Sequence, residues 1–282
     1  MKKLLVIFLL LSVNIQLYST IDTTGYKFIE CKLQPFDKKK LKIKNKKHPS
    51  QPHIPAIKTF VENTTLNSQN WSGYVEVTNL QTPAVNSVTA VSGSWNVPKL
   101  SPTPDTSYCS LWVGIDGYKS PTVEQLGTGH EWVNNSQYDY AWFEMYPQGA
   151  SVISNFPLKV GDSISASVVY QGDGIFLLSI ANNTKKVHTS IPTQYTTSTT
   201  ALRSSAEWIA EAPEYNSILP LANFSQVNFI GCTTVINGLY KQINSTFFQN
   251  AAINMIYNGG FKALTSTLTN GGQGFNVVWK HE

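Results

Sequence analysis

The sequence has little charge and few histidines, and each shortage excludes a class of protein. Only 13% of the 282 residues are charged, which is not the composition expected of a nucleic-acid-binding protein. After residue 66 there are three histidines and no HExxH, paired-histidine or cysteine-cluster spacing, so we expect neither a zinc site nor another metal or cofactor. No GxSxG motif is present, which argues against a serine hydrolase of the elbow type.

Two further catalytic classes lack the residues they need. We interpret His130 as a surface loop residue rather than the base of a catalytic triad. Residues 105–107 (DTS) are similar to an aspartic-protease loop, but such an enzyme needs two of these loops with glycine third. What remains for acid–base chemistry is a set of carboxylates and one amide: Glu124, Gln125, Glu131, Asp139, Glu144, Glu207 and Glu211.

Long apolar runs are confined to the N-terminus. Lys2 and Lys3 precede an apolar run over residues 4–11, which is typical of a secretory signal. We therefore predict a signal peptide at residues 1–19 and a secreted protein. No other apolar run approaches the ~20 residues that span a bilayer, so we expect no membrane attachment once the signal is removed.

The net charge of +4 hides a strong asymmetry. Residues 1–66 hold 12 Lys and 4 acidic residues, whereas residues 67–282 hold 8 Lys, Arg203 and 13 acidic residues, which gives +8 and −4. Seven of the lysines lie at 38–47. Residues 20–66 could be a basic linker or a propeptide that lies on an acidic surface of its own chain, and residues 67–282 form the remaining domain.

The cysteines leave two alternatives open. Cys31 lies in the leader, so Cys109 and Cys232 are the only possible internal pair in the body. Export permits a disulfide between them. They could equally be two buried thiols, because sequence does not reveal the distance between their Cα atoms.

From residue 70 onward the pattern is that of an all-β protein, with short alternating segments between turn residues. Ile164, Ala166 and Val168 share one face of an expected strand, and serines occupy the other face. This pattern indicates a sheet with one face in solvent, whose apolar face must pack against a second sheet. A hairpin is expected at Gly172-Asp173-Gly174. The expected strands are residues 71–77, 88–97, 108–116, 138–146, 162–170, 175–181 and 275–280.

Residues 111–129 combine a buried strand, a glycine-flanked turn and a second strand that begins near Thr122. Period-two alternation places Gln125 on one face of the second strand and Glu124 on the other. Residues 204–211 (SSAEWIAE) are ambiguous. They could open a helix with Ser204 as N-cap, or form a strand with Glu207 and Glu211 on one face.

Five blocks, in this order and with compatible spacing, resemble the glutamic peptidases, or eqolisins. They are residues 70–75 (NWSGYV), 112–117 (WVGIDG), 124–128 (EQLGT), 140–147 (YAWFEMYP) and 206–211 (AEWIAE). The resemblance runs from about residue 70 to the C-terminus. It implies a two-sheet antiparallel β-sandwich of concanavalin-like shape with a cleft on the concave face, a strand at residues 204–211, and polypeptide substrates.

The family's catalytic glutamine falls on Gln125 and its glutamate on Glu211. The interval from the turn to the glutamine is one residue shorter than in the fungal type member, so Glu124 is kept as a competitor. Amide hydrolysis needs a base for water, a proton for the leaving amine and a donor for the oxyanion. Glu211 can serve as base and then as acid, and Gln125 as the uncharged donor, in an acid endopeptidase.

Other residues of the matched blocks can be interpreted as functional or as purely structural. Asp116, Asp139 and Glu144 could orient the catalytic pair, but turn capping would explain Asp116 and surface exposure would explain Asp139. The tryptophans of these blocks could line the substrate cleft or belong to the core: Trp71, Trp112 and Trp142.

The alternatives for function are a carbohydrate-binding module and a glycoside hydrolase with Glu144 and Glu211 as its carboxylate pair. We expect a monomer whose own basic propeptide is its latent partner.

Overall fold

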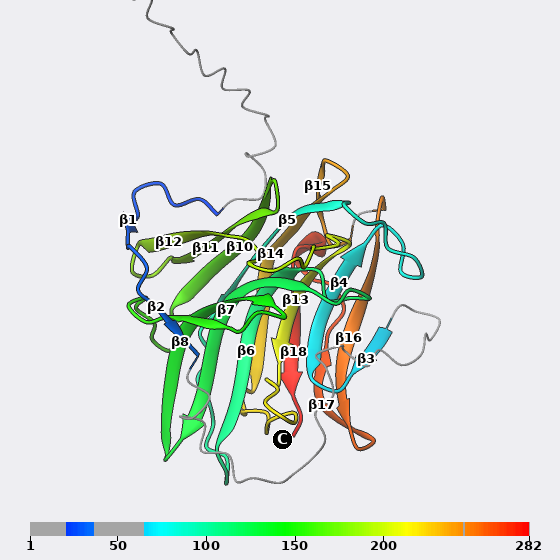
Figure 1. Cartoon of the computed structure of the whole chain (residues 1–282). Helices are drawn as coiled ribbons and strands as arrows, with labels where there is room; N and C mark the ends of the chain where they lie inside the picture. The colour runs from blue at the N-terminus through cyan, green and yellow to red at the C-terminus, as the bar shows by residue number, and fades with distance from the viewer. Residues whose placement is uncertain (1–20, 37–64, 245, 282) are drawn as a thin grey trace, which may run out of the picture.

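The computed structural model describes residues 21–36, 65–244 and 246–281, which fold almost entirely as β-strands (Figure 1). The expected signal peptide and the basic run at 38–47 lie outside these ranges. The one helix in the described part is a short 3-10 turn, Asn270–Gly272. No helix there is long and apolar enough to cross a membrane.

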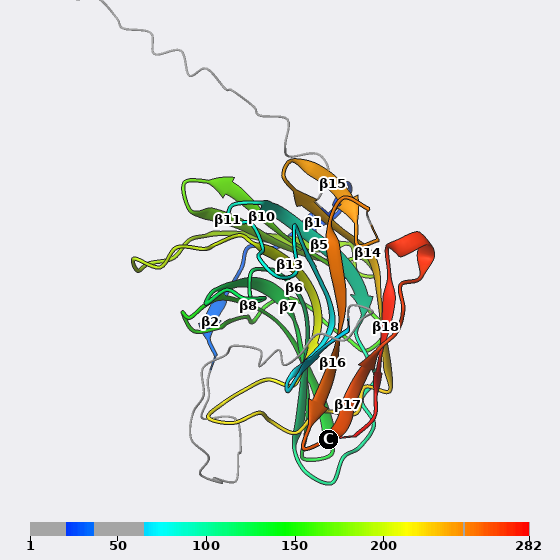
Figure 2. The ribbon, with the colours of Figure 1, turned by 90° about the vertical axis from the view of Figure 1, so that its right-hand side faces the viewer.

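Two curved sheets lie one over the other, as Figure 2 shows from the side. The first, which we call the back sheet, is ordered β1–β12–β11–β10–β5–β14–β15. All its neighbours are antiparallel except β1 and β12, which run parallel. Its strands are β1 (Lys27–Phe28), β5 (Val88–Asn96), β10 (Ser163–Gly172), β11 (Ile175–Asn182), β12 (Val187–Thr193), β14 (Gln226–Ile236) and β15 (Leu239–Gln242).

The second sheet, which we call the cleft sheet, is ordered β2–β9–β8–β7–β6–β13–β4–β16. β16 also pairs with β3 and β17, and β17 pairs with β18. Its strands are β2 (Leu33–Pro35), β3 (Thr65–Ser68), β4 (Trp71–Val77), β6 (Ser107–Ile115), β7 (Val123–Val133), β8 (Ser136–Tyr146), β9 (Ser151–Ile153), β13 (Ser205–Glu211), β16 (Gln249–Tyr257), β17 (Gly260–Thr265) and β18 (Phe275–Trp279).

β14 belongs to both sheets. Its first residues, from Gln226 to Phe229, pair with β18, and its last residues, from Thr233 to Ile236, pair with β5. The register shifts between these halves, where Gly231 has φ +61°, a conformation that costs glycine little. The bulge lets one strand cross from one sheet to the other and so closes one side of the sandwich.

Two indole hydrogen bonds join the sheets through the core. Trp95 of the back sheet donates to Thr128 Oγ1 at 2.9 Å, and Trp208 of the cleft sheet donates to the Ser92 carbonyl at 2.7 Å. Trp95 and Trp208 are at most 1% exposed. Because buried indole N–H groups need an acceptor, these bonds hold the sheets in one relative position as well as filling the space between them.

The sandwich predicted from the sequence is confirmed, and each expected strand is present with ends shifted by at most two residues. The ambiguous segment is strand β13 rather than a helix. The possible disulfide is not formed. Cys109 and Cys232 are free buried thiols packed in the core between the sheets, where each takes the place of a small apolar side chain.

Candidate active site

Strand alternation points three polar side chains toward the open face of the cleft sheet. Gln125 of β7 lies opposite Glu144 of β8 and opposite Gly114 of β6. Glu211, the last residue of β13, lies opposite Ser110 of β6. Since β6 stands between β7 and β13, residues far apart in sequence meet over a single strand.

Two glycines of β7 make room on this face. A Cβ at Gly127 would lie 2.6 Å from the Trp112 Cβ and 2.1 Å from the Leu111 carbonyl oxygen. A Cβ at Gly129 would lie 2.4 Å from the Tyr140 ring. Any side chain here would collide with its neighbours, so the bare backbone of β7 is what allows Trp112 and Tyr140 to lie over it.

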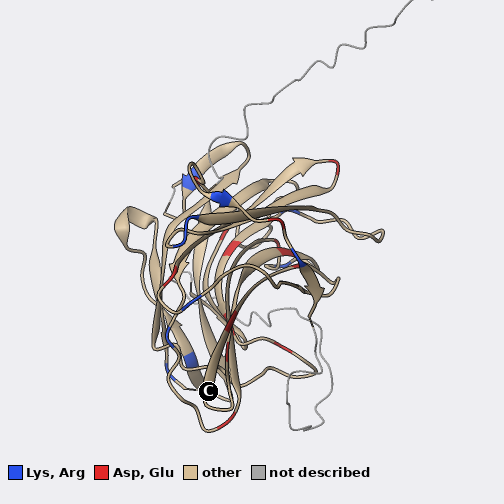
Figure 3. Cartoon of the chain, turned by 90° about the vertical axis from the view of Figure 1, so that its left-hand side faces the viewer, with Lys and Arg blue, Asp and Glu red and all other residues tan. Residues whose placement is uncertain are grey.

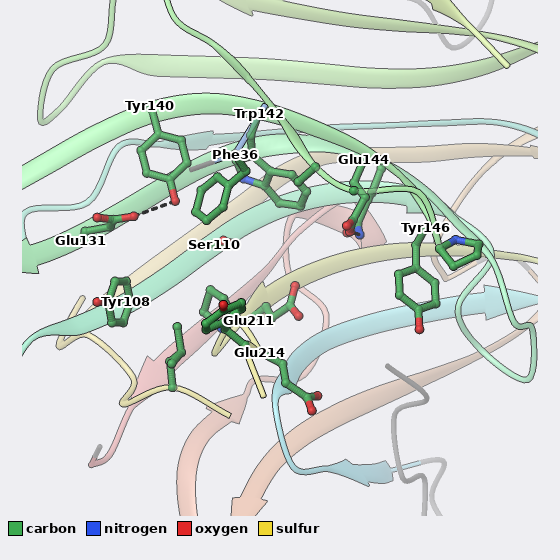
Figure 4. Close-up of a pocket in the computed structure, with 17 residues that line it drawn as sticks. Phe36, Tyr108, Ser110, Glu131, Tyr140, Trp142, Glu144, Tyr146, Glu211 and Glu214 are labelled. Carbon is green, nitrogen blue, oxygen red and sulfur yellow. Dashed lines mark hydrogen bonds between the residues drawn. The ribbon is translucent and has the colours of Figure 1, made fainter. Parts of the chain in front are cut away.

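These strands enclose a pocket with a volume of about 200 Å³ (Figure 4). Gln125, Trp142 and Glu144 line one part of it, and Glu211 and Glu214 line another. Figure 4 shows the Glu211 and Glu214 side chains on the side of the pocket facing the one that carries Glu144. The pocket therefore has carboxyl groups on two of its walls.

Glu211 is 5% exposed, and both of its carboxylate oxygens accept hydrogen bonds. Its Oε2 accepts a 2.8 Å hydrogen bond from Trp112 Nε1, and its Oε1 accepts a 3.3 Å bond from Asn70 Nδ2. The pKa of Glu211 is raised to about 8, mainly by burial, with a smaller contribution from the nearby charge of Glu144, while the Trp112 bond acts in the opposite direction. Glu211 thus keeps its proton well above the ordinary range of a carboxylic acid.

Within the described residues, Gln125 forms side-chain hydrogen bonds through only one end of its amide. Its Nε2 donates a 2.8 Å hydrogen bond to Glu144 Oε2. Its Oε1 is buried and has no hydrogen-bond partner among the described residues. A side-chain amide carries two N–H groups and a carbonyl oxygen, so Gln125 can still donate one hydrogen bond and accept others.

The three tryptophans considered for the substrate cleft have different positions. Trp142 lines the pocket. Trp112 is fully buried and reaches the site only through its bond to Glu211. Trp71 packs edge-on against Trp112, with ring centroids 4.9 Å apart, and so supports it from β4.

Three other carboxyls that the sequence brought into consideration lie outside the pocket. Asp116, at φ +68° in the turn after β6, accepts hydrogen bonds from Thr122 and Ser204, so it caps the turn. Glu124 is buried against the Tyr195 hydroxyl on the opposite face of β7, which removes it as a competitor for Gln125. Glu207 is buried with its Oε1 bound to the Tyr118 N–H, so it does not belong to an accessible acidic surface.

The interpretation of His130 as a surface loop residue is wrong. His130 is 0% exposed in β7, with Nδ1 2.7 Å from Asp139 Oδ1 and Nε2 2.9 Å from Thr128 Oγ1. Its side chain lies on the face of β7 opposite Gln125, and this places Asp139 with it, away from the pocket. The His130–Asp139 pair cross-links β7 and β8 on the face away from Gln125.

Acidic positions lie on inner strands of the fold and also on its outer turns (Figure 3). Glu144 and Glu211 line the pocket, whereas Asp105 and Asp173 are exposed. Within residues 21–36, 65–244 and 246–281, no three His, Cys, Asp or Glu side chains are arranged to hold a metal ion.

Comparison with known proteins identifies the family. The model of the Peptidase A4 family matches residues 69–279. This chain belongs to that family, the glutamic peptidases or eqolisins. The resemblance drawn from its five blocks is therefore confirmed, and membership of a peptidase family favours peptide hydrolysis over a carbohydrate-binding module or a glycoside hydrolase.

Individual relatives agree with this assignment. The chain is 31% identical to scytalidopepsin B of Scytalidium lignicola over 172 residues, which span 58% of this chain and 65% of that protein. It is 28% identical to aspergillopepsin-2 of Aspergillus niger over 71% of this chain and 78% of that protein. A crystal structure of scytalido-glutamic peptidase with a transition state analogue inhibitor has a TM-score of 0.63 and 26% identity, and covers 75% of this chain and 98% of that one.

Sequence reasoning missed several residues of the site, among them Asn70 and Phe36. Asn70 lies in a matched block, but nothing in its pattern indicates the bond to Glu211. Phe36 lies in the segment expected to be a linker or propeptide, yet its side chain lines the pocket. A signal for Phe36 was present only in part, because residues 28–36 intersperse apolar residues with polar ones ahead of the lysines.

Proposed function

We propose that this glutamic peptidase is an acid endopeptidase that cuts proteins with Gln125 and Glu211 as its catalytic pair. The observation that carries the proposal is that Glu211, buried and bound by Trp112, lines the same pocket as Gln125, whose buried carbonyl oxygen has no hydrogen-bond partner among the described residues. A base, a proton source and an uncharged donor are thus available around one substrate-sized space.

In the proposed reaction a water molecule attacks the carbonyl carbon of the scissile bond. Gln125 Oε1 accepts one hydrogen bond from that water, while ionised Glu211 takes its proton. A carboxyl with a raised pKa is a stronger base once ionised, and the Trp112 and Asn70 bonds favour the ionised form that must exist for this step.

The proton then passes from Glu211 to the nitrogen of the leaving amine as the C–N bond breaks. The oxyanion receives the N–H of Gln125 that is not bound to Glu144, and a neutral amide suits this place because a carboxylate would repel the developing charge. The proton that Glu211 took from the water thus ends on the amine, and Glu211 returns to the ionised form for the next turnover.

The test is digestion of an unfolded protein by wild type and Glu211→Gln, prepared in the same way, at pH 3, 5, 7 and 9. Mass spectrometry should find internal fragments with wild type at acid pH, and none above background with Glu211→Gln at any of these pH values. Equal cleavage by folded Glu211→Gln would reject the proposal.

We also propose that the chain is secreted through its predicted signal at residues 1–19, and that the lysines at 38–47 keep it latent. Glu207 is unavailable as their partner because it is buried, so Glu214, which is only partly buried at the pocket, is the carboxylate they would reach. Ion pairs of this exposed kind are worth only ~0.2–1 kcal/mol each, so latency needs several together. Replacing the seven lysines with glutamine should then give activity before the leader is removed, and unchanged latency would argue against them.

A further inference from the structure

The N-terminal segment, residues 21–36, pairs with one edge of each sheet (Figures 1 and 2). β1 runs parallel to β12 in the back sheet. β2 runs antiparallel to β9 in the cleft sheet, from Leu33 opposite Ile153 to Pro35 opposite Ser151. β9 has only β8 on its other side, so β9 would be the sheet edge if β2 were absent.

Phe36 continues this pairing into the candidate active site. Its backbone N–H donates to the Ala150 carbonyl at 3.1 Å. Its ring lies 5.9 Å from the Tyr140 ring, centroid to centroid, and lines the same pocket as Trp142 and Glu211. Figure 4 shows Phe36 beside Tyr140 and Trp142.

The walls around Phe36 are chemically suited to a large apolar side chain. The Tyr140 hydroxyl is turned toward Glu131, to which it donates a 2.9 Å hydrogen bond, so its ring presents carbon to Phe36. Trp142 presents a second aromatic surface. Aromatic walls of this kind favour another aromatic ring or a long aliphatic chain over a charged group.

The β2–β9 pairing that positions Phe36 is short, so another extended polypeptide could take the place of β2. All three residues of β2 are exposed, so little apolar surface holds the strand in place. An exposed sheet edge can accept any extended polypeptide through its backbone groups, while side-chain pockets supply the selectivity. Phe36 is part of the same chain as the pocket, so its occupancy does not depend on protein concentration.

We propose that the Phe36 position is a substrate subsite for a large apolar or aromatic residue, presented by a strand that pairs antiparallel with β9. In the intact chain this subsite is held by the chain's own residues 33–36, in the manner of a bound substrate. The inference rests on the proposed peptidase function, whose substrates are extended polypeptides, and it names the side-chain class that one part of the cleft selects.

The test compares binding in full-length Glu211→Gln, in which no turnover is expected. Phe36→Ala is introduced into this background, and Phe28→Ala serves as the matched control. Phe28 belongs to the same N-terminal segment, is 54% exposed, and packs its ring 5.4 Å from His188, outside the pocket. The probe is the blocked peptide acetyl-Ala-Ala-Phe-Ala-Ala-amide, with a second peptide carrying Asp in place of Phe, and binding is followed by calorimetry.

We expect Phe36→Ala to bind the Phe peptide at least tenfold more tightly than Phe28→Ala or the parent, and the Asp peptide no more tightly than they do. Phe36→Leu should behave as the parent because it keeps an apolar side chain in the subsite. Equal affinities in the Phe36→Ala and Phe28→Ala chains would overturn the inference, as would equal gains for the Phe and Asp peptides. Near-UV circular dichroism should confirm that all variants are folded.

These outcomes are separable from those of the proposed function. If wild type gives no fragments while Phe36→Ala still gains affinity for the Phe peptide, the subsite stands and the peptidase proposal fails. If wild type cuts proteins while Phe36→Ala gains nothing, the catalytic proposal stands and the subsite is rejected.

Discussion

Trp112 Nε1 donates a 2.8 Å hydrogen bond to Glu211 Oε2 across the paired strands β6 and β13. The bond joins two blocks of sequence about a hundred positions apart. It also opposes the effect of burial, because a donated hydrogen bond favours the ionised carboxylate whereas burial favours the protonated one. The balance between the two sets where Glu211 titrates.

Trp112→Phe should therefore move the titration of Glu211 upward. Without the indole N–H the pKa of Glu211 rises. The part of the kcat/KM pH profile whose midpoint is set by Glu211 should therefore shift toward higher pH. Hydrogen bonds to charged groups contribute about 1.5–3 kcal/mol, so kcat at acid pH should fall roughly 10- to 100-fold. Trp142→Phe is the control. Trp142 lines the pocket and its indole nitrogen has no hydrogen-bond partner among the described residues, so its loss should change KM and leave that part of the pH profile in place.

Gln125→Ala should lower kcat by roughly 10²- to 10³-fold, the range measured for loss of an oxyanion donor, without unfolding the chain. Glu124→Gln is the matched neighbour. Its side chain lies on the other face of β7, and burial raises the pKa of Glu124 far above its ordinary value, so a neutral amide should be tolerated. Steady-state kinetics would contradict the assignment if Glu124→Gln lost activity and Gln125→Ala kept it.

Stability should fall as the pH rises from about 4.5 toward 8. Burial raises the pKa of Glu76 from its ordinary 4.5 to about 8, and neither of its carboxylate oxygens has a partner among the described residues. In this window the folded chain keeps a proton that the unfolded chain releases, so the free energy of unfolding declines by up to about 1.4 kcal/mol per pH unit for such a group.

Glu76→Gln removes this titration and should raise the Tm relative to wild type at pH 7 by several degrees, but hardly at all at pH 4. Asp105→Asn, which alters an exposed carboxyl, is the control and should give the same small difference at both pH values. Thermal unfolding followed by circular dichroism decides the matter, and a Tm difference for Glu76→Gln that is the same at pH 4 and pH 7 would show that Glu76 does not carry the effect.

Proteolysis should resist EDTA, thiol reagents and serine-directed acylating agents. The proposed reaction uses a carboxyl and an amide, and Cys109 and Cys232 are buried in the core. Rates of peptide hydrolysis with and without each reagent are the measurement. Inhibition by EDTA that added zinc reverses would reopen the question of a metal.

Much of the fold and part of the site could be predicted from sequence, because side-chain direction along a strand is a local property. Alternation alone separates Gln125 from Glu124 and places Glu207 and Glu211 on one face of β13. The order of the five blocks identified the family, and the serine-lined face of residues 163–167 indicated stacked sheets.

Tertiary structure decided which of these residues meet. Strand pairing and register bring Asn70, Trp112 and Glu211 together, and they bury His130 between the sheets. The same pairings turn Asp116 and Asp139 away from the pocket and leave two cysteines as separate thiols. Phe36 lies in the cleft because β2 pairs with β9, and these two strands are more than a hundred residues apart in the sequence. Such contacts depend on the geometry of the whole sandwich, which no local pattern of residues encodes.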